Sequence, residues 1–217
     1  YLAQNPPDWE VEIKSGLQGL GTAWSCAHGL GRWMDDCGCG SQGRHQKWRR
    51  PLREALDWLR DCLAAVYEQE GGPLMLDIWK ARDAYIDVIL DRSEASVGRF
   101  MRGHLISDSP SAREKALRLL EMQRHSLLMY TSCGWFFSDI SGIETVQNLQ
   151  YAARAVELAR EASGMDLEPG LLARLKLAPC NFPEYGDGEG VYRKLVLPAK
   201  VGEDLLAAHF GICALFD

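Results

Sequence analysis

The sequence predicts an all-α fold, an antiparallel multi-helix bundle preceded by a loop region rich in Gly, Trp and Cys. From Trp48 onward, apolar residues recur at spacings of three and four along several long segments. The connections between these segments are short, which favours antiparallel packing of neighbouring helices. Hydrophobic residues make up 47% of the chain and charged residues 25%, enough to bury a core.

We expect one domain with two regions. Residues 1–47 form an irregular loop segment packed on the bundle, and residues 48–217 form the bundle. Within the first region, residues 9–13 (WEVEI) alternate in polarity and could form a short strand. Residues 16–43 are typical of an ordered loop with one short helix, because glycines interrupt any helical periodicity.

The first helix of the bundle starts near Pro51, which a first turn tolerates, and ends at Gly71 and Gly72. A second helix is expected over residues 73–90, and Ser93 can cap a third. The buried stripe of the first helix comprises Leu52, Leu56, Leu59, Leu63 and Val66.

Two further long helices carry capping-box spacing at their starts. Ser111 and Glu114 precede the fourth helix, and Ser141 and Glu144 precede the fifth, which stops at Gly164. A short helix over residues 169–177 and a loop follow. The final segment is helical in pattern, and Pro198 should kink or split it.

Composition excludes several classes of function. The net charge of −6, with acidic and basic residues interspersed, argues against nucleic-acid partners. No stretch reaches the roughly 20 apolar residues that span a membrane. Seven scattered cysteines favour a reducing, cytoplasmic location. Tyr1 and the apolar last residues lead us to expect a segment of a longer chain, and no motif indicates a cofactor.

The first candidate binding stretch is residues 21–40. Trp24, His28, Arg32 and Trp33 lie close together among glycines. Indole faces stack on sugar rings, Arg and His bond hydroxyls, and a glycine-rich backbone lets a ligand approach closely. The alternative is that the tryptophans simply pack this loop onto the bundle.

The same stretch contains Cys26-x-His28 and Cys37-x-Cys39. Four soft ligands within fourteen residues could hold zinc. The match is weak because zinc pairs are usually separated by two to four residues. A disulfide or free small thiols are the alternatives, so we assign no residue to a metal.

The second candidate stretch is residues 130–145. Trp135, Phe136 and Phe137 are consecutive, so one helix face cannot bury all three. Asp139 and Glu144 could suggest a glycosidase pair, but a turn at Asp139 and a capping box at Glu144 are the favoured explanations. We therefore assign Trp135, Phe136 and Asp139 to substrate contact, and no residue to catalysis.

The third stretch, residues 180–192, contains three side chains that could line a groove. A plain surface loop is the favoured interpretation. The side chains are Phe182, Tyr185 and Asp187.

Several segments resemble an uncharacterised helical domain that follows the catalytic barrel in some glycoside hydrolase family 57 proteins, which are α-amylase- or α-mannosidase-like. The segments that carry the resemblance are AWSCAHGLGRWMDDCGC, WRRPLREALDWLRD, LEMQRHSLLMYTSCGWFFSDISGIETVQNLQYAARAVELA and NFPEYGDGEGVYRKLVLPAKV. The resemblance covers roughly residues 15–213. It implies that the glutamate nucleophile and aspartate acid/base lie upstream, on a barrel that this sequence lacks.

The resemblance also implies a role for TSCGWFF. In such helical regions a Ser-Asp-Trp-like core faces the substrate, which would place Trp135 in the cleft. Gly134 stands where an aspartate is expected, and Asp139 is one possible substitute.

The favoured function is therefore an accessory domain that lines the saccharide cleft of an upstream barrel in the same chain, with an oligosaccharide as ligand. The alternative is a structural or interaction module, in which a metal clips the Cys/His loop.

Overall fold

The computed structural model describes residues 4–6, 12, 14–16, 19, 21–39 and 43–215. These residues form helices and turns, and none of them lies in a β-strand, so the all-α prediction is confirmed for this part of the chain. The strand expected over residues 9–13 lies outside the described residues, Glu12 excepted.

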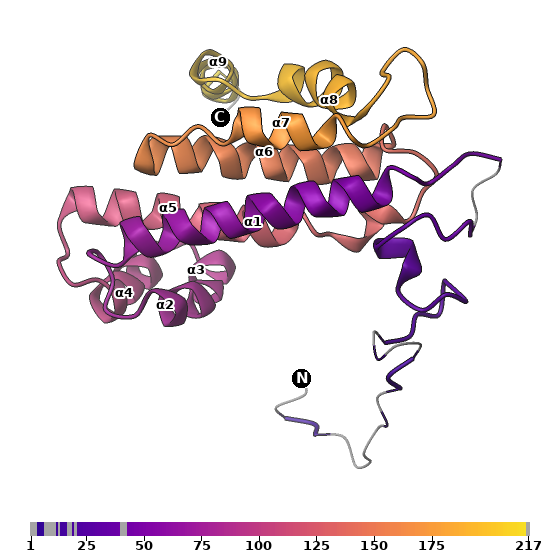
Figure 1. The fold of residues 1–217 in the computed structure, drawn as a ribbon. Coiled ribbons are helices and arrows are strands. Elements are labelled where there is room, and N and C mark those ends of the chain that lie inside the picture. The colour runs from indigo at the N-terminus through magenta and orange to yellow at the C-terminus, as the bar shows by residue number, and fades with distance from the viewer. Residues whose placement is uncertain are drawn as a thin grey trace.

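Four helices make up the body of the bundle. Helix α1 (Arg49–Gly71) lies beside α5 (Pro110–Leu128) and α6 (Ile143–Ser163), and α7 (Glu168–Leu175) packs against α1 (Figure 1). The stripe predicted for α1 is confirmed, because its residues are at most 2% exposed. They are Leu52, Leu56, Leu59, Leu63 and Val66.

Three short helices cover one end of this body: α2 (Ile78–Ala84), α3 (Ile86–Leu90) and α4 (Glu94–His104). The single helix expected over residues 73–90 is thus wrong. Met75 instead forms an isolated antiparallel bridge with Leu105, in which the Leu76 amide donates to the His104 carbonyl and the Ile106 amide donates to the Leu74 carbonyl. This pairing is a long-range contact that local periodicity does not reveal.

The predicted cap of α4 is confirmed, since Ser93 accepts from the Ser96 amide. The capping box expected at Ser111 is wrong: Ser109 caps α5 and accepts from the Ala112 amide. Pro110 explains the shift, because its fixed φ favours the first helical position and moves the cap upstream.

Helix α6 also starts without the expected capping box. Gly142 is its N-cap and offers no side chain, while the hydroxyl of Ser141 donates to Asp139. The predicted stop is confirmed: Gly164 has a φ of 77°, a left-handed conformation that glycine adopts without steric cost.

The C-terminal part is a series of short helical pieces. It comprises α8 (Gly188–Val191), a π turn (Tyr192–Val196), a 3₁₀ turn (Leu197–Ala199) and α9 (Glu203–Cys213). The helical segment is interrupted around Pro198 as predicted, because this residue lies in the 3₁₀ turn between the π turn and α9. Helix α9 exposes large apolar side chains: Leu205, Leu206, Phe210 and Ile212.

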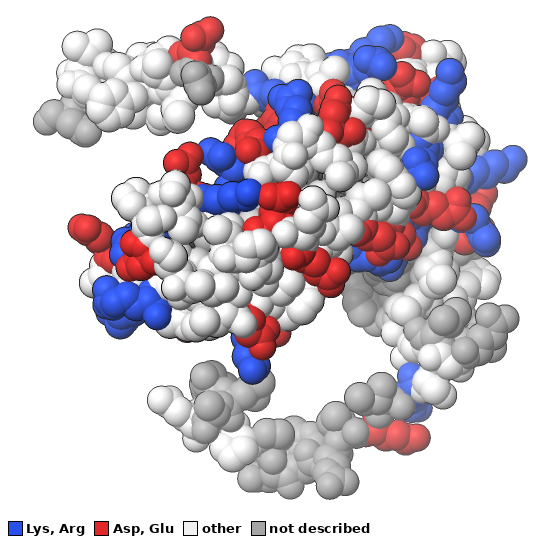
Figure 2. Space-filling view, turned by 60° about the vertical axis from the view of Figure 1, so that its left-hand side comes forward, with Lys and Arg blue, Asp and Glu red and all other residues white. Residues whose placement is uncertain are grey.

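Basic and acidic side chains alternate over the face of the bundle seen in Figure 2, without a field of one sign. Ion pairs between neighbours on the surface account for much of this pattern. Among the described residues, no helix combines the length and the apolar character needed to cross a membrane.

Glu121 on α5 connects the bundle to the short helices. Its carboxylate accepts from Tyr85 (2.7 Å), Arg92 (2.8 Å) and Arg124 (3.0 Å), and its side chain is 21% exposed. Burial acts to raise the pKa of Glu121, but these hydrogen bonds outweigh burial and lower the pKa from 4.5 to about 2.

We predict that Glu121→Gln lowers the free energy of unfolding at neutral pH by about 1–3 kcal/mol. The folded pKa lies below the unfolded one, so the contribution is present above pH 4.5 and is lost as pH falls toward 2. Urea unfolding over this pH range should therefore show a flatter pH dependence in the variant. Glu114→Gln, at a side chain 70% exposed, is the control and should change little. Parallel pH curves for Glu121→Gln and the wild type would contradict this account.

Candidate functional site

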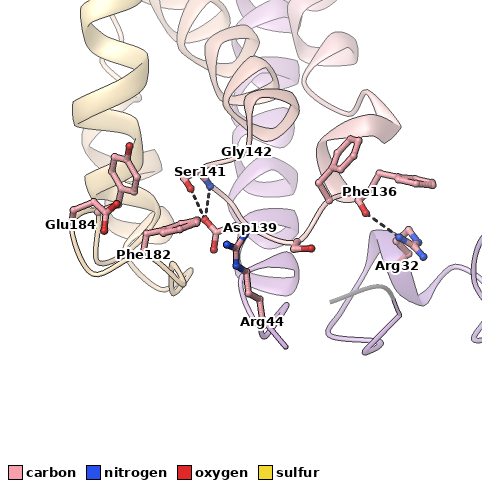
Figure 3. Close-up of a pocket in the computed structure, with 11 residues that line it drawn as sticks. Arg32, Arg44, Phe136, Asp139, Ser141, Gly142, Phe182 and Glu184 are labelled. Carbon is pink, nitrogen blue, oxygen red and sulfur yellow. Dashed lines mark hydrogen bonds between the residues drawn. The ribbon is translucent and has the colours of Figure 1, made fainter. Parts of the chain in front are cut away.

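Segments from three distant parts of the sequence meet at one pocket of about 750 Å³. They are the N-terminal loop, the connection between α5 and α6, and the connection between α7 and α8 (Figure 3). The pocket is thus built from all three stretches that the sequence singled out. Its lining includes four aromatic rings, two arginines and several polar groups: Arg32, Arg44, Phe136, Phe137, Ser138, Asp139, Ser141, Gly142, Phe182, Glu184 and Tyr185.

Arg32 holds the N-terminal loop against the pocket wall. It donates to the carbonyl of Phe136 (2.9 Å) and to that of Ser25 (2.8 Å), and its guanidinium lies 4.6 Å from the centre of the Phe136 ring. The residue is 8% exposed. Both terminal nitrogens of Arg32 donate to main-chain oxygens, so this side chain positions the pocket wall. Each of these nitrogens keeps a second N–H, and the bond expected from Arg32 to a sugar hydroxyl stays a prediction.

The two tryptophans of the N-terminal loop have different surroundings. Trp24 is 94% exposed, with its ring centre 6.2 Å from that of Phe136. Trp33 is partly buried, packs against the core and donates its indole N–H to the carbonyl of Ser132 (3.2 Å). Trp24 therefore offers a free aromatic face beside the pocket, whereas Trp33 anchors the loop.

The three consecutive aromatic residues of the second stretch are divided between core and pocket. Trp135 is 1% exposed and stacks on Tyr130, so its ring is not available to a ligand, contrary to the sequence expectation. Phe136 and Phe137 line the pocket, and Phe137 is 48% exposed. The 3₁₀ turn Ser132–Trp135 causes this division, because it directs the indole inward.

Gly134 allows this turn to lie directly on α6. A Cβ atom there would lie 2.1 Å from the amide nitrogen of Asn148, which donates to the carbonyl of Thr131 (2.9 Å). The hydroxyl of Thr145 donates to the Gly134 carbonyl (2.6 Å). There is thus no room for the aspartate that the resemblance leads one to expect at this position.

Asp139 is also not free to bind a ligand, which corrects the role expected from the sequence. It is 4% exposed and accepts from the amide and hydroxyl of Ser141, from the amide and side chain of Asn181, and from the thiol of Cys180. Burial acts to raise its pKa, but the bonds from Ser141 and Asn181 prevail and lower it. Asp139 therefore joins the second and third stretches as a structural carboxylate.

The third stretch supplies one side of the pocket, which the interpretation as a plain surface loop missed. Phe182 lies under the guanidinium of Arg44, 4.6 Å from ring centre to carbon. Asn181 and His45 exchange two hydrogen bonds, which join this stretch to the residues before α1. The sequence signal for this role was the aromatic pair Phe182 and Tyr185 in NFPEYG. Asp187 instead caps α8 by accepting from the Gly190 amide.

A family model described as "Domain of unknown function (DUF3536)" matches residues 44–217. The chain belongs to this family. No curated protein and no solved structure matches the chain. The DUF3536 match includes the bundle and two of the three walls of the pocket, while Arg32 and the glycine-rich loop precede it.

The loop that precedes the DUF3536 match also contains a candidate metal centre. The ligand atoms of four residues lie within 4.8 Å of one another. His28 is one of them, so it lies in this cluster and not in the lining of the pocket. The residues are Cys26, His28, Cys37 and Cys39.

We predict that Asp139→Asn lowers the free energy of unfolding by about 2–4 kcal/mol, because either orientation of the amide directs an N–H at a donor of Ser141 or Asn181. Since the pKa of Asp139 is lowered on folding, the wild-type advantage is present above the ordinary value of 3.8 and shrinks as the carboxylate is protonated in acid.

Chemical unfolding at neutral and acidic pH measures this difference. Asp61→Asn, at a side chain 69% exposed, is the matched control, with an expected change below about 0.5 kcal/mol. Equal effects of the two substitutions would show that Asp139 does not join the loops.

Proposed function

We propose that this DUF3536 chain is the accessory helical domain of a family 57-like glycoside hydrolase and lines the saccharide-binding cleft of a catalytic barrel in the same chain. The substrates would be α-glucans or related α-glycosides. The observation that supports this best is the meeting of three distant, aromatic-bearing segments around one open pocket. The barrel partner and the family 57 assignment rest on the resemblance of the sequence segments quoted above.

The lining has the chemistry that a sugar requires. The rings of Phe136, Phe137 and Phe182 present flat apolar faces, which suit the C–H faces of pyranose rings. Glu184 and Arg44 are exposed at the rim and can bond hydroxyls. Trp24 extends the aromatic surface beyond the pocket.

The proposed role is binding and orientation, not bond cleavage. Asp139 is a poor general acid, because its hydrogen bonds favour the ionised form. Contacts remote from the reacting bond still affect turnover, since they position the substrate. None of the seven cysteines forms a disulfide, in keeping with the cytoplasmic location that we propose.

We predict that the double variant Phe136→Ala, Phe182→Ala weakens oligosaccharide binding by about fivefold to 150-fold, since each ring contributes about 0.5–1.5 kcal/mol of stacking. Titration calorimetry of the full-length protein with malto-oligosaccharides measures the affinity, and kcat/KM measures the effect on turnover. Phe210→Ala, which removes a ring that is 75% exposed on α9, is the control and should leave both unchanged. Trp135→Ala is not suitable as a test of ligand binding, because it would leave a cavity in the core and destabilise the fold.

The alternative, a docking module without a saccharide role, is distinguished by the same variants. In that case the pocket substitutions would leave oligosaccharide affinity and turnover unchanged. They would instead weaken the association of this domain with the barrel, measured as easier proteolytic separation of the two. That pair of results would overturn the saccharide proposal.

A further inference from the structure

In the Cys/His cluster of the N-terminal loop, three of the four ligand atoms have nearly the spacing of tetrahedral metal ligands, and all four lie within 4.8 Å of one another. The sulfurs of Cys26 and Cys39 are 3.9 Å apart, and Nδ1 of His28 lies 3.9 Å and 3.5 Å from them. Zinc bonds of about 2.3 Å to sulfur and 2.0–2.1 Å to nitrogen separate tetrahedral ligands by roughly 3.5–3.8 Å. A disulfide would need about 2.05 Å between sulfurs, so Cys26 and Cys39 do not form a cystine here, and their spacing is compatible with metal ligands.

Glycines explain how pairs spaced by a single residue converge. Gly38 lies between Cys37 and Cys39 with a φ of 72°, and Gly29 follows His28 with a φ of 64°. A Cβ atom on Gly31 would lie 3.3 Å from Cβ of His28 and 3.4 Å from Cβ of Cys37. The loop thus closes on itself where only hydrogen fits comfortably, and this compensates for the unusual spacing.

A buried cation next to the cluster points to negative charge on its sulfurs. Arg49 is 0% exposed and donates to the sulfur of Cys37 (3.4 Å). Its other bonds go to neutral oxygens of Gln46 and Phe137, and it forms no ion pair with a carboxylate within the described ranges. Three thiolates around a divalent cation carry a net charge of −1, which would balance the guanidinium.

Gln46 supports the ligand loop from the other side. It is 0% exposed, and its amide donates to the carbonyl of Cys39 (3.1 Å) while its oxygen accepts from Arg49 (2.7 Å). Groups that orient metal ligands in this way are typical of built sites.

We propose that this loop binds one structural zinc ion through three thiolates and one imidazole. The ligands are Cys26, His28, Cys37 and Cys39. Four protein ligands leave no open position for water or substrate, so the site stabilises structure and does not catalyse.

The zinc site fixes the loop that carries Arg32. Ser25 precedes the first ligand and accepts from Arg32, which in turn donates to Phe136 at the pocket wall. Metal binding therefore orders one side of the pocket. This link to saccharide binding rests on the proposed function, whereas the metal site itself does not.

The test is the metal content of the full-length protein, purified under reducing conditions without chelator and measured by mass spectrometry of the elements. We expect about one zinc per chain, and less than about a tenth of that in the double variant Cys37→Ser, Cys39→Ser. Cys62→Ser and Cys133→Ser replace cysteines outside the cluster and should keep the metal. Far-UV circular dichroism should stay helical in every variant, because the cluster lies outside the bundle helices.

Two further measurements sharpen the result. Cobalt substitution should give thiolate-to-metal charge transfer and the intense visible bands of a tetrahedral site. Gln46→Leu should weaken zinc affinity by about tenfold in competition with a chelator, without removing a ligand.

Protein without bound metal, a Cys26–Cys39 disulfide found by peptide mapping, or iron in place of zinc would each overturn the proposal. Because the assay involves no sugar, its failure would leave the saccharide proposal standing. Unchanged saccharide binding in the pocket variants, which would overturn the saccharide proposal, would likewise leave the zinc proposal standing.

Discussion

The burial of the first turn of α1 is the constraint on which both the pocket and the Cys/His loop depend. Trp48 and Arg49 are 0% exposed, although they lie at the start of the helix. The indole of Trp48 donates to the carbonyl of Ser138, and the guanidinium of Arg49 donates to Phe137 and to Cys37. The bundle core therefore continues directly into the loops, and a helix end that is usually solvated serves as their anchor.

The helices and the loops of this structure are held together by different kinds of interaction. The helices are held by apolar burial that tolerates changes of similar volume. The loops are held by a few directional hydrogen bonds, which Arg32 and Arg49 donate to backbone carbonyls and Asp139 accepts from amides and side chains. Such bonds fix geometry more narrowly than packing does, which is what a binding surface requires.

The helical framework could be predicted because its signals are local. The stripe of α1, the cap at Ser93 and the stop at Gly164 each depend on residues within a turn or two. The expected single helix over residues 73–90 failed because the backbone of residues 74–76 bonds that of residues 104–106 in place of helical partners. The place of the site was predictable, but not every role within it. The sequence singled out Trp135 and Asp139, but it does not show that the indole stacks on Tyr130 or that the carboxylate bonds Asn181. Residue spacing alone does not determine which way a ring or a carboxylate points.

The shared acceptor at Asp139 has a dynamic consequence. The amides of Ser141 and Asn181 bond the same carboxylate from two connections far apart in the chain. An opening that releases either amide disturbs a carboxylate that the other amide also bonds, so we expect the two openings to be coupled. The two connections should thus behave as one cooperative unit in hydrogen exchange, more slowly exchanging than the surface turns around them.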